Sequence, residues 1–325
     1  PRAMKSAGYA TAHFGKWHLG GGRDVVDPPK FAAYGYDEHA GTWESPEPHP
    51  DITASNWIWS DKDPVKRWER TGFFVDKTLD FLARHHRERP CFVNLWPDDT
   101  HTPWVPGPDA PKGDAPENLR RVLVELDRQV GRLLEGLKTL GIDDRTLVVF
   151  TSDNGALPTF KGARSAGLRG SKLSLYEGGL RMPFLARWPG RIPAGRVDET
   201  TVLGAVDLFP SFCAIAGAAL PGGARLDGQD LSGALLGTPA ARKAPLFWEY
   251  GRNDAFYKYP AGRDRSPAVA VRDGRWKLLV NADGTGAELY DLAADPAESA
   301  SVADRNTETA FRLTEAATAW RRSLP

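Results

Sequence analysis

Apolar residues return along this chain at two spacings, one typical of helices and one typical of buried strands. Between Glu117 and Leu140 they recur every three or four positions, which predicts a long amphipathic helix ended at Gly141. Shorter patterns of the same kind predict helices over residues 73–86 and 207–215. Apolar runs of strand length cover residues 10–14, 91–96, 146–151 and 183–188.

The order of these elements predicts the fold class. Strands that alternate with helices indicate parallel βαβ units, so we expect an α/β fold with a mostly parallel sheet sandwiched by helices. After about residue 240 short strand-like pieces follow one another at 246–250, 269–272, 276–280 and 288–290, before a helix over 307–321. They predict a small antiparallel sheet with one helix. We therefore expect two domains, residues 1–240 and 241–325.

Composition narrows the class of protein. The 325 residues carry 42 Lys and Arg against 42 Asp and Glu. This balance argues against a nucleic-acid binder or a membrane-surface protein, which usually need a basic excess. No apolar run approaches the roughly 18 residues of a membrane span. Two cysteines cannot build a disulfide framework, and nothing in the sequence indicates an oligomeric state.

Polar clusters follow directly after strand-like runs, where ligands bind in α/β sheets. In Gly15–Gly20, Lys16 and His18 stand two apart on an extended segment and should project to the same side. A fixed positive charge beside a titratable donor suits an anionic group, although a surface turn accounts for them equally well. His101 follows the run 91–96 and is placed to act as an acid or hydrogen-bond donor, although a lone His there is more often structural.

Two further clusters follow the run 146–151. Asp153 and Asn154 offer hard oxygen ligands suited to Ca²⁺ or Mg²⁺, and an Asx turn is the alternative reading. Lys172 adds a cation in a glycine-lined loop that could approach an anion closely. By itself such a loop is weak evidence for a site.

Together these clusters resemble the formylglycine-dependent sulfatase family of the alkaline-phosphatase superfamily. The segment Gly15-Lys16-Trp17-His18-Leu19-Gly20 looks like the second sulfatase signature. Later blocks are similar to the family in order and spacing, at residues 151–155, 176–183, 207–211, 270–278 and 288–292. The resemblance covers nearly the whole chain and implies an alkaline-phosphatase-like fold.

The resemblance implies roles for four cationic side chains. Lys16 matches the lysine that contacts the sulfate and the hydroxyl of the nucleophile, and His18 matches the histidine that hydrogen-bonds the nucleophile and helps to expel sulfate from it. His101 and Lys172 match the pair beside the ester oxygen, which would stabilise or protonate the departing alcohol. Cations around the transferring group and a proton source for the leaving group are what sulfate-ester cleavage needs.

The resemblance also implies a metal and a nucleophile. Asp153 and Asn154 match two ligands of the family's single divalent cation, usually Ca²⁺, with Mg²⁺ as the alternative. The family's formylglycine is made from a cysteine in Cys-x-Pro-x-Arg, or from a serine in some bacteria, upstream of the Lys-Trp-His signature. Cys91 and Cys213 stand in other contexts, and the family's two N-terminal metal aspartates and motif arginine are not matched.

We therefore expect a sulfuric ester hydrolase of arylsulfatase type that lacks its N-terminal segment and is inactive as this chain alone. The chain opens without an initiator Met or a signal-peptide pattern. Two alternatives stay open. One is a phosphonate monoester or phosphodiester hydrolase of the same superfamily, and the other is a non-catalytic binder of sulfate esters.

The substrate is indicated only by class. The segment from Gly20 to Asp63 holds Trp43, Trp57 and Trp59, whose rings could stack on sugars, although they could equally pack the loop onto the domain. We expect sulfated carbohydrates as substrates, and the resemblance implies a periplasmic or extracellular location.

Overall fold

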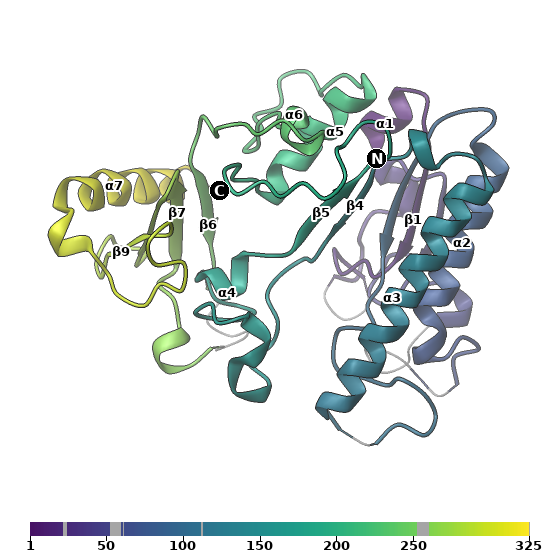
Figure 1. Cartoon of the computed structure of the whole chain (residues 1–325), viewed down its shortest axis with the longest axis horizontal. Coiled ribbons are helices and arrows are strands. Elements are labelled where there is room, and N and C mark those ends of the chain that lie inside the picture. Colours follow the sequence, from purple (N-terminus) through teal and green to yellow (C-terminus); the bar gives the residue numbers. More distant parts are fainter. Residues whose placement is uncertain (22–24, 53–59, 61, 112, 252–259, 325) are drawn as a thin grey trace. The chain divides into compact units, whose positions relative to one another are not determined.

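The computed structural model describes the chain except for residues 22–24, 53–59, 61, 112, 252–259 and 325. The chain forms two compact units, and each is described by itself (Figure 1). Unit 1 comprises Pro1–Thr146, Trp188–Gly190 and Pro210–Arg225, and unit 2 comprises Leu147–Arg187, Arg191–Phe209 and Leu226–Pro325. The domain boundary near residue 240 stays a prediction.

A three-stranded parallel sheet forms the centre of unit 1. Strand β1 (Ala10–Gly15) lies between β2 (Glu38–Gly41) and β3 (Cys91–Trp96). Gly15 is opposite Gly41 on one side and Trp96 on the other, so the three strands end together at their carboxyl edge. Every residue of β1 is buried, which agrees with its central place in the sheet.

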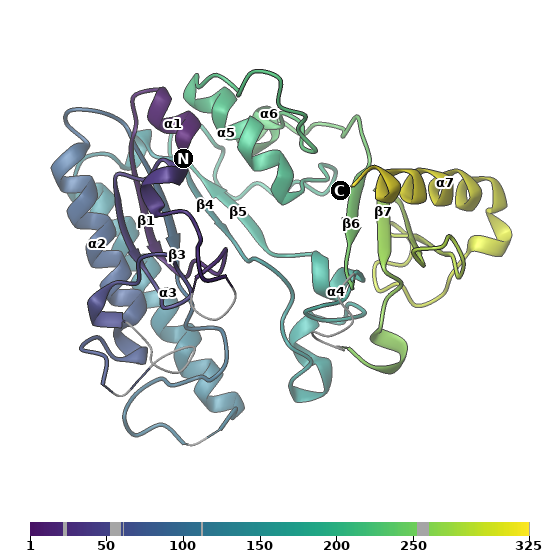
Figure 2. The same ribbon diagram turned by 180° about the vertical axis from the view of Figure 1, so that it is seen from behind.

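Two long helices accompany this sheet. Helix α2 (Arg70–His85) packs against β1 and β3, and α3 (Pro116–Thr139) packs against α2 (Figure 2). The rings of Phe14 on β1 and Phe81 on α2 meet edge to face at 6.2 Å between centroids. The predicted helix 117–140 is confirmed to within one residue at each end, because its apolar stripe is long and regular. Unit 1 also contains the short helix α1 (Arg2–Ser6) and most of α5 (Leu208–Ala216), whereas the short helix α6 (Ser232–Leu235) belongs to unit 2.

Unit 2 contains two antiparallel sheets. Strands β4 (Val148–Thr151) and β5 (Phe184–Arg187) pair with each other, and between them in sequence lies α4 (Glu177–Leu180). Both strands were predicted, but their antiparallel pairing corrects the expectation of parallel units here. An apolar run indicates a strand and says nothing of its direction.

The second sheet of unit 2 confirms the predicted C-terminal architecture. Four strands follow in the order β6-β7-β8-β9, covered by helix α7 (Thr307–Ser323). Apolar side chains from the sheet and the helix, including Val271, Leu278 and Leu313, form a fully buried core. The strand bounds are Leu246–Glu249, Val269–Asp273, Trp276–Val280 and Glu288–Asp291. Among the described residues, no helix is both long and apolar enough to cross a membrane.

Candidate active site

Lys16 and His18 follow β1 at the carboxyl edge of the parallel sheet. The backbone N–H of Lys16 donates to the carbonyl of Trp96 at 2.8 Å, and that of His18 donates to the carbonyl of Glu44 at 2.9 Å. The segments that follow all three strands are thus tied together. The structure therefore places these two residues where the sequence pattern expects a ligand site.

The intervening Trp17 anchors the segment that carries Lys16 and His18. Trp17 is buried and packs edge to face on His13, with 5.1 Å between ring centroids. The backbone of His18 has a φ of 51°, so the segment is not extended at this residue and the expected alternation of side chains does not continue through it. Lys16 is half-buried, whereas His18 is exposed. Burial lowers the pKa of His13 to about 4, so its ring stays neutral and is part of the core.

His101 lies in the turn that follows β3. Its backbone N–H donates to the carbonyl of Asp98 at 3.0 Å, and its ring Nδ1 lies 2.7 Å from the carbonyl oxygen of Thr102. A carbonyl can only accept, so Nδ1 carries the proton in this contact. In the neutral ring Nε2 is then the acceptor, and in the charged ring it is a donor.

A buried ion network supports this turn and was not predicted from the sequence. Arg67 donates to the carbonyls of Asp98 and His101 at 2.5 and 3.1 Å, and it also pairs with the Asp98 carboxylate at 2.5 Å. Arg70 bridges the carboxylates of Asp98 and Asp63 at 3.2 and 3.3 Å. Burial alone would raise the pKa of Asp98, but the two guanidinium groups hold it below its ordinary value. The Asp98 carboxylate thus keeps its charge inside unit 1.

Asp153 and Asn154 follow β4 in unit 2. One carboxylate oxygen of Asp153 accepts from the Asn154 backbone N–H at 2.9 Å, and the Asn154 side-chain amide donates to the carbonyl of Gly155 at 3.0 Å. Both contacts join adjacent residues, whereas an Asx turn accepts an N–H two residues further on, so they do not form that turn. Asp153 is exposed and brings a carboxylate next to an amide, a donor set that fits a hard divalent cation. Within the described residues, no group of three or more His, Cys, Asp and Glu side chains is arranged for a metal.

The loop of Lys172 is joined to this segment through the backbone. The N–H of Lys172 donates to the carbonyl of Ala156 at 2.8 Å, and the N–H of Gly155 donates to the carbonyl of Gly179 at 3.0 Å. A side chain at Gly155 would clash with the carbonyl oxygen of Gly178. Glycine therefore permits the close approach that brings the three candidate residues of unit 2 together.

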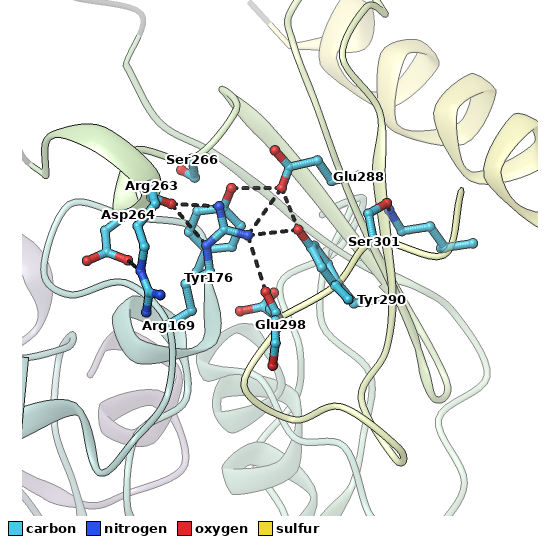
Figure 3. Close-up of polar contacts among 12 residues, drawn as sticks. Arg169, Tyr176, Arg263, Asp264, Ser266, Glu288, Tyr290, Glu298 and Ser301 are labelled. Atoms are coloured by element: carbon cyan, nitrogen blue, oxygen red, sulfur yellow. Dashed lines mark hydrogen bonds and ion pairs between the residues drawn. The ribbon is translucent and has the colours of Figure 1, made fainter. Parts of the chain in front are cut away.

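Arg169 fastens the Lys172 loop to the C-terminal sheet. Its guanidinium lies over the ring of Tyr176 at 3.7 Å and donates to the hydroxyl of Tyr290 at 2.8 Å (Figure 3). The same group donates to the carbonyl oxygens of Arg263, at 2.9 and 2.6 Å, and of Glu298, at 3.2 Å. One planar side chain thus joins four separate parts of unit 2.

A second network holds the start of α4. Lys277 is fully buried and pairs with the carboxylates of Glu177 at 2.8 Å and Glu298 at 2.9 Å. The Glu298 carboxylate also accepts the backbone N–H of Glu177 at 2.5 Å. Residues Tyr176–Pro183 resemble a family block in sequence. Lys277 lies 100 residues further on, and no sequence pattern predicts its contact with Glu177.

The candidate residues therefore fall into two groups. The structure brings Lys16, His18 and His101 to one sheet edge of unit 1, and it gathers the other three in adjoining loops of unit 2. Their roles stay predictions. Trp57 and Trp59 lie outside the described residues, whereas Trp43 is half-buried.

Neither cysteine is suited to act as a nucleophile. Burial raises the pKa of the Cys91 thiol to about 11 and also raises that of Cys213, which is almost fully buried. A thiol with a raised pKa holds little thiolate at neutral pH. Cys213 is a core residue, whereas Cys91 is half-buried.

Comparison with known families identifies the class of this protein. The sulfatase family model matches residues 1–218, and a second model, N-sulphoglucosamine sulphohydrolase C-terminal, matches residues 171–318. The chain belongs to the sulfatase family.

Individual relatives agree with this assignment. Human arylsulfatase A is 32% identical over 90% of this chain and 60% of its own length. The N-acetylgalactosamine-6-O-sulfatase of Bacteroides thetaiotaomicron is 25% identical, over 96% of this chain and 74% of its own length. A solved structure from the glycosaminoglycan metabolism of that bacterium has a TM-score of 0.76 at 23% identity, and it covers 97% of this chain and 80% of that one. The predicted fold class is thereby confirmed.

Proposed function

We propose that this protein hydrolyses sulfate esters of carbohydrates with the help of a divalent cation. The observation that carries the proposal is the sulfatase family match over residues 1–218, which includes all six candidate side chains. The chain spans about half to three quarters of the length of the relatives it matches, so the activity is proposed for the full-length protein.

The residues of unit 1 would bind the sulfate and serve the leaving group. Lys16 would contact the sulfate and the hydroxyl of the nucleophile, and His18 would hydrogen-bond the nucleophile and help to expel sulfate from it. His101 would donate a proton from Nε2 to the departing alcohol, because the Thr102 carbonyl accepts from Nδ1 and stabilises the charged ring. Lys172, in unit 2, would stabilise the same ester oxygen.

Asp153 and Asn154 would hold the cation, with Ca²⁺ as the first candidate and Mg²⁺ as the second. When bound, such an ion withdraws charge from the sulfate oxygens. A formylglycine from outside these 325 residues would supply the attacking hydroxyl. Because neither Cys91 nor Cys213 stands in a Cys-x-Pro-x-Arg motif, and the family's two N-terminal metal aspartates are not matched, we expect the 325-residue chain alone to be inactive.

Carbohydrate substrates are proposed from the relatives. The bacterial relative carries the name N-acetylgalactosamine-6-O-sulfatase, which refers to a sulfated amino sugar. A periplasmic or extracellular location follows from the same family reading and is proposed with it.

The experiment compares sulfate and phosphate esters. The full-length protein should release sulfate from N-acetylgalactosamine 6-sulfate and from 4-nitrophenyl sulfate, and EDTA should abolish this until Ca²⁺ or Mg²⁺ is restored. The phosphohydrolase alternative would be favoured if the protein hydrolysed bis(4-nitrophenyl) phosphate or phenyl phosphonate esters faster than the sulfate esters. Binding of the sulfated sugar without turnover would favour the non-catalytic binder.

A further inference from the structure

Glu44 stands behind His18 and has no role in the site described so far. It lies three residues beyond the end of β2, and its side chain is only 8% exposed. Its carboxylate oxygen Oε2 is 3.4 Å from His18 Nε2, while its backbone carbonyl accepts the His18 N–H at 2.9 Å. One residue thus contacts both the backbone and the ring of His18.

The backbone of His18 is fixed in an uncommon conformation. Its φ of 51° lies in the left-handed region, which a non-glycine residue adopts only where its surroundings demand it. The N–H of Thr42 donates to the Gly15 carbonyl at 3.2 Å, so the segment that carries Glu44 is tied to the end of the strand that precedes His18. Backbone hydrogen bonds therefore hold the segments that carry the His18 imidazole and the Glu44 carboxylate next to each other.

A carboxylate can only accept a hydrogen bond, so the imidazole nitrogen that faces it must carry the proton. A buried carboxylate beside a histidine selects one tautomer and one ring orientation by this means. We propose that Glu44 is a positioning residue that holds the His18 ring with its proton on Nε2. This inference rests on the proposed function in one respect only, which is that a wrongly oriented His18 ring should lower the rate of sulfate release.

The primary test reads the ring and does not depend on activity. In long-range ¹H–¹⁵N spectra of the full-length protein, the His18 signals can be assigned by their loss in His18→Gln. In the wild type the neutral ring should show Nε2 as the protonated nitrogen. Glu44→Ala should shift the Nε2 resonance towards the average of two exchanging tautomers.

Glu47→Ala is the matched control. Glu47 lies on the same segment, and its carboxylate is 3.7 Å from Nε2 of His39, not of His18. This variant should change the His39 signals and leave those of His18 in place. If Glu44→Ala fails to fold, Glu44→Gln keeps the volume with a weaker acceptor and should shift the His18 Nε2 signal in the same direction, by less.

Activity separates the two hypotheses. Glu44→Ala should lower kcat about 10- to 100-fold, the range seen when the partner that orients a functional histidine is lost, with a much smaller change in KM. An unchanged His18 spectrum in the Glu44 variants overturns the positioning role, whatever the activity. A shifted spectrum together with full activity of His18→Gln would leave the positioning contact in place and overturn the proposed role of His18.

Discussion

The candidate residues fall into two halves, one in each unit, which are held in place by different means. In unit 1, Lys16 and His101 follow adjacent parallel strands, and the register of Gly15 with Trp96 places their segments side by side. In unit 2, the loop of Lys172 is held by Arg169 and by the buried Lys277, whose partners lie far away in the sequence. The first half depends mainly on strand pairing and the second on side-chain networks. Side-chain changes away from the candidate residues should therefore disturb the second half more widely.

The largest effect is expected from Lys277→Met. The change leaves the carboxylates of Glu177 and Glu298 buried without their cation, and breaking a buried ion pair costs about 3–5 kcal/mol. Urea unfolding should show this loss, and hydrogen exchange should locate it in unit 2. Lys138→Met, which removes an exposed pair on α3, is the control and should change stability by less than about 0.5 kcal/mol. Equal losses in the two variants would contradict the account of unit 2.

Gly155→Ala should have the next largest effect and lower the free energy of unfolding by about 3 kcal/mol. The added methyl group would clash with the backbone of Gly178, which cannot move as a side-chain end can. The N–H contact with Gly179 would be pushed apart, and the affinity for the divalent cation should fall with it. Calorimetric Ca²⁺ titration measures the second effect. Gly222→Ala, where a methyl group would meet no atom within 4 Å, is the matched control, and a similar fall there would refute the steric argument.

Arg169→Ala should cost about 2 kcal/mol, the sum of a few partly exposed hydrogen bonds and the contact with the Tyr176 ring. Arg169→Lys should recover only part of this, because an ammonium group cannot reproduce the planar fork. Thermal unfolding and proteolysis of the Lys172 loop report the two effects. Full recovery by Lys would show that charge alone fastens the loop.

The smallest effect concerns the pH dependence of unit 1. Burial raises the pKa of Asp99 to about 6, above its ordinary 3.8, so the folded state binds this proton more tightly than the unfolded state. The resulting stability is present below about pH 4 and is lost as pH rises through 6. The free energy of unfolding of Asp99→Asn, measured relative to the wild type, should therefore rise by about 1–2 kcal/mol as the pH increases from 4 to 7. A difference that does not change with pH would contradict the raised pKa.

The same contrast explains what could be predicted from the sequence. Strand 91–96 and the helix near 117–140 were predicted because their apolar periodicity is local, and Lys16 and His101 were placed correctly because they follow such strands. The antiparallel direction of β5 was not predicted, since direction depends on the connection. The network of Arg67 and Asp98 was missed as well, because its two members are 31 residues apart and neither shows a pattern. Glu177 and Lys277 likewise come together only when the C-terminal sheet has folded, so their contact was not predicted.

We propose that Lys16 and Lys172 both act in sulfate-ester cleavage, as the family resemblance implies for each. A double-mutant cycle on sulfate release by the full-length protein, with Lys16→Ala, Lys172→Ala and the pair, tests it most directly. We predict that each single change lowers kcat/KM at least about 100-fold. We also predict that the pair loses much less than the product of the two losses, because residues that act on one transition state are coupled. Full activity of either single variant, or strictly multiplicative losses, would contradict the claim.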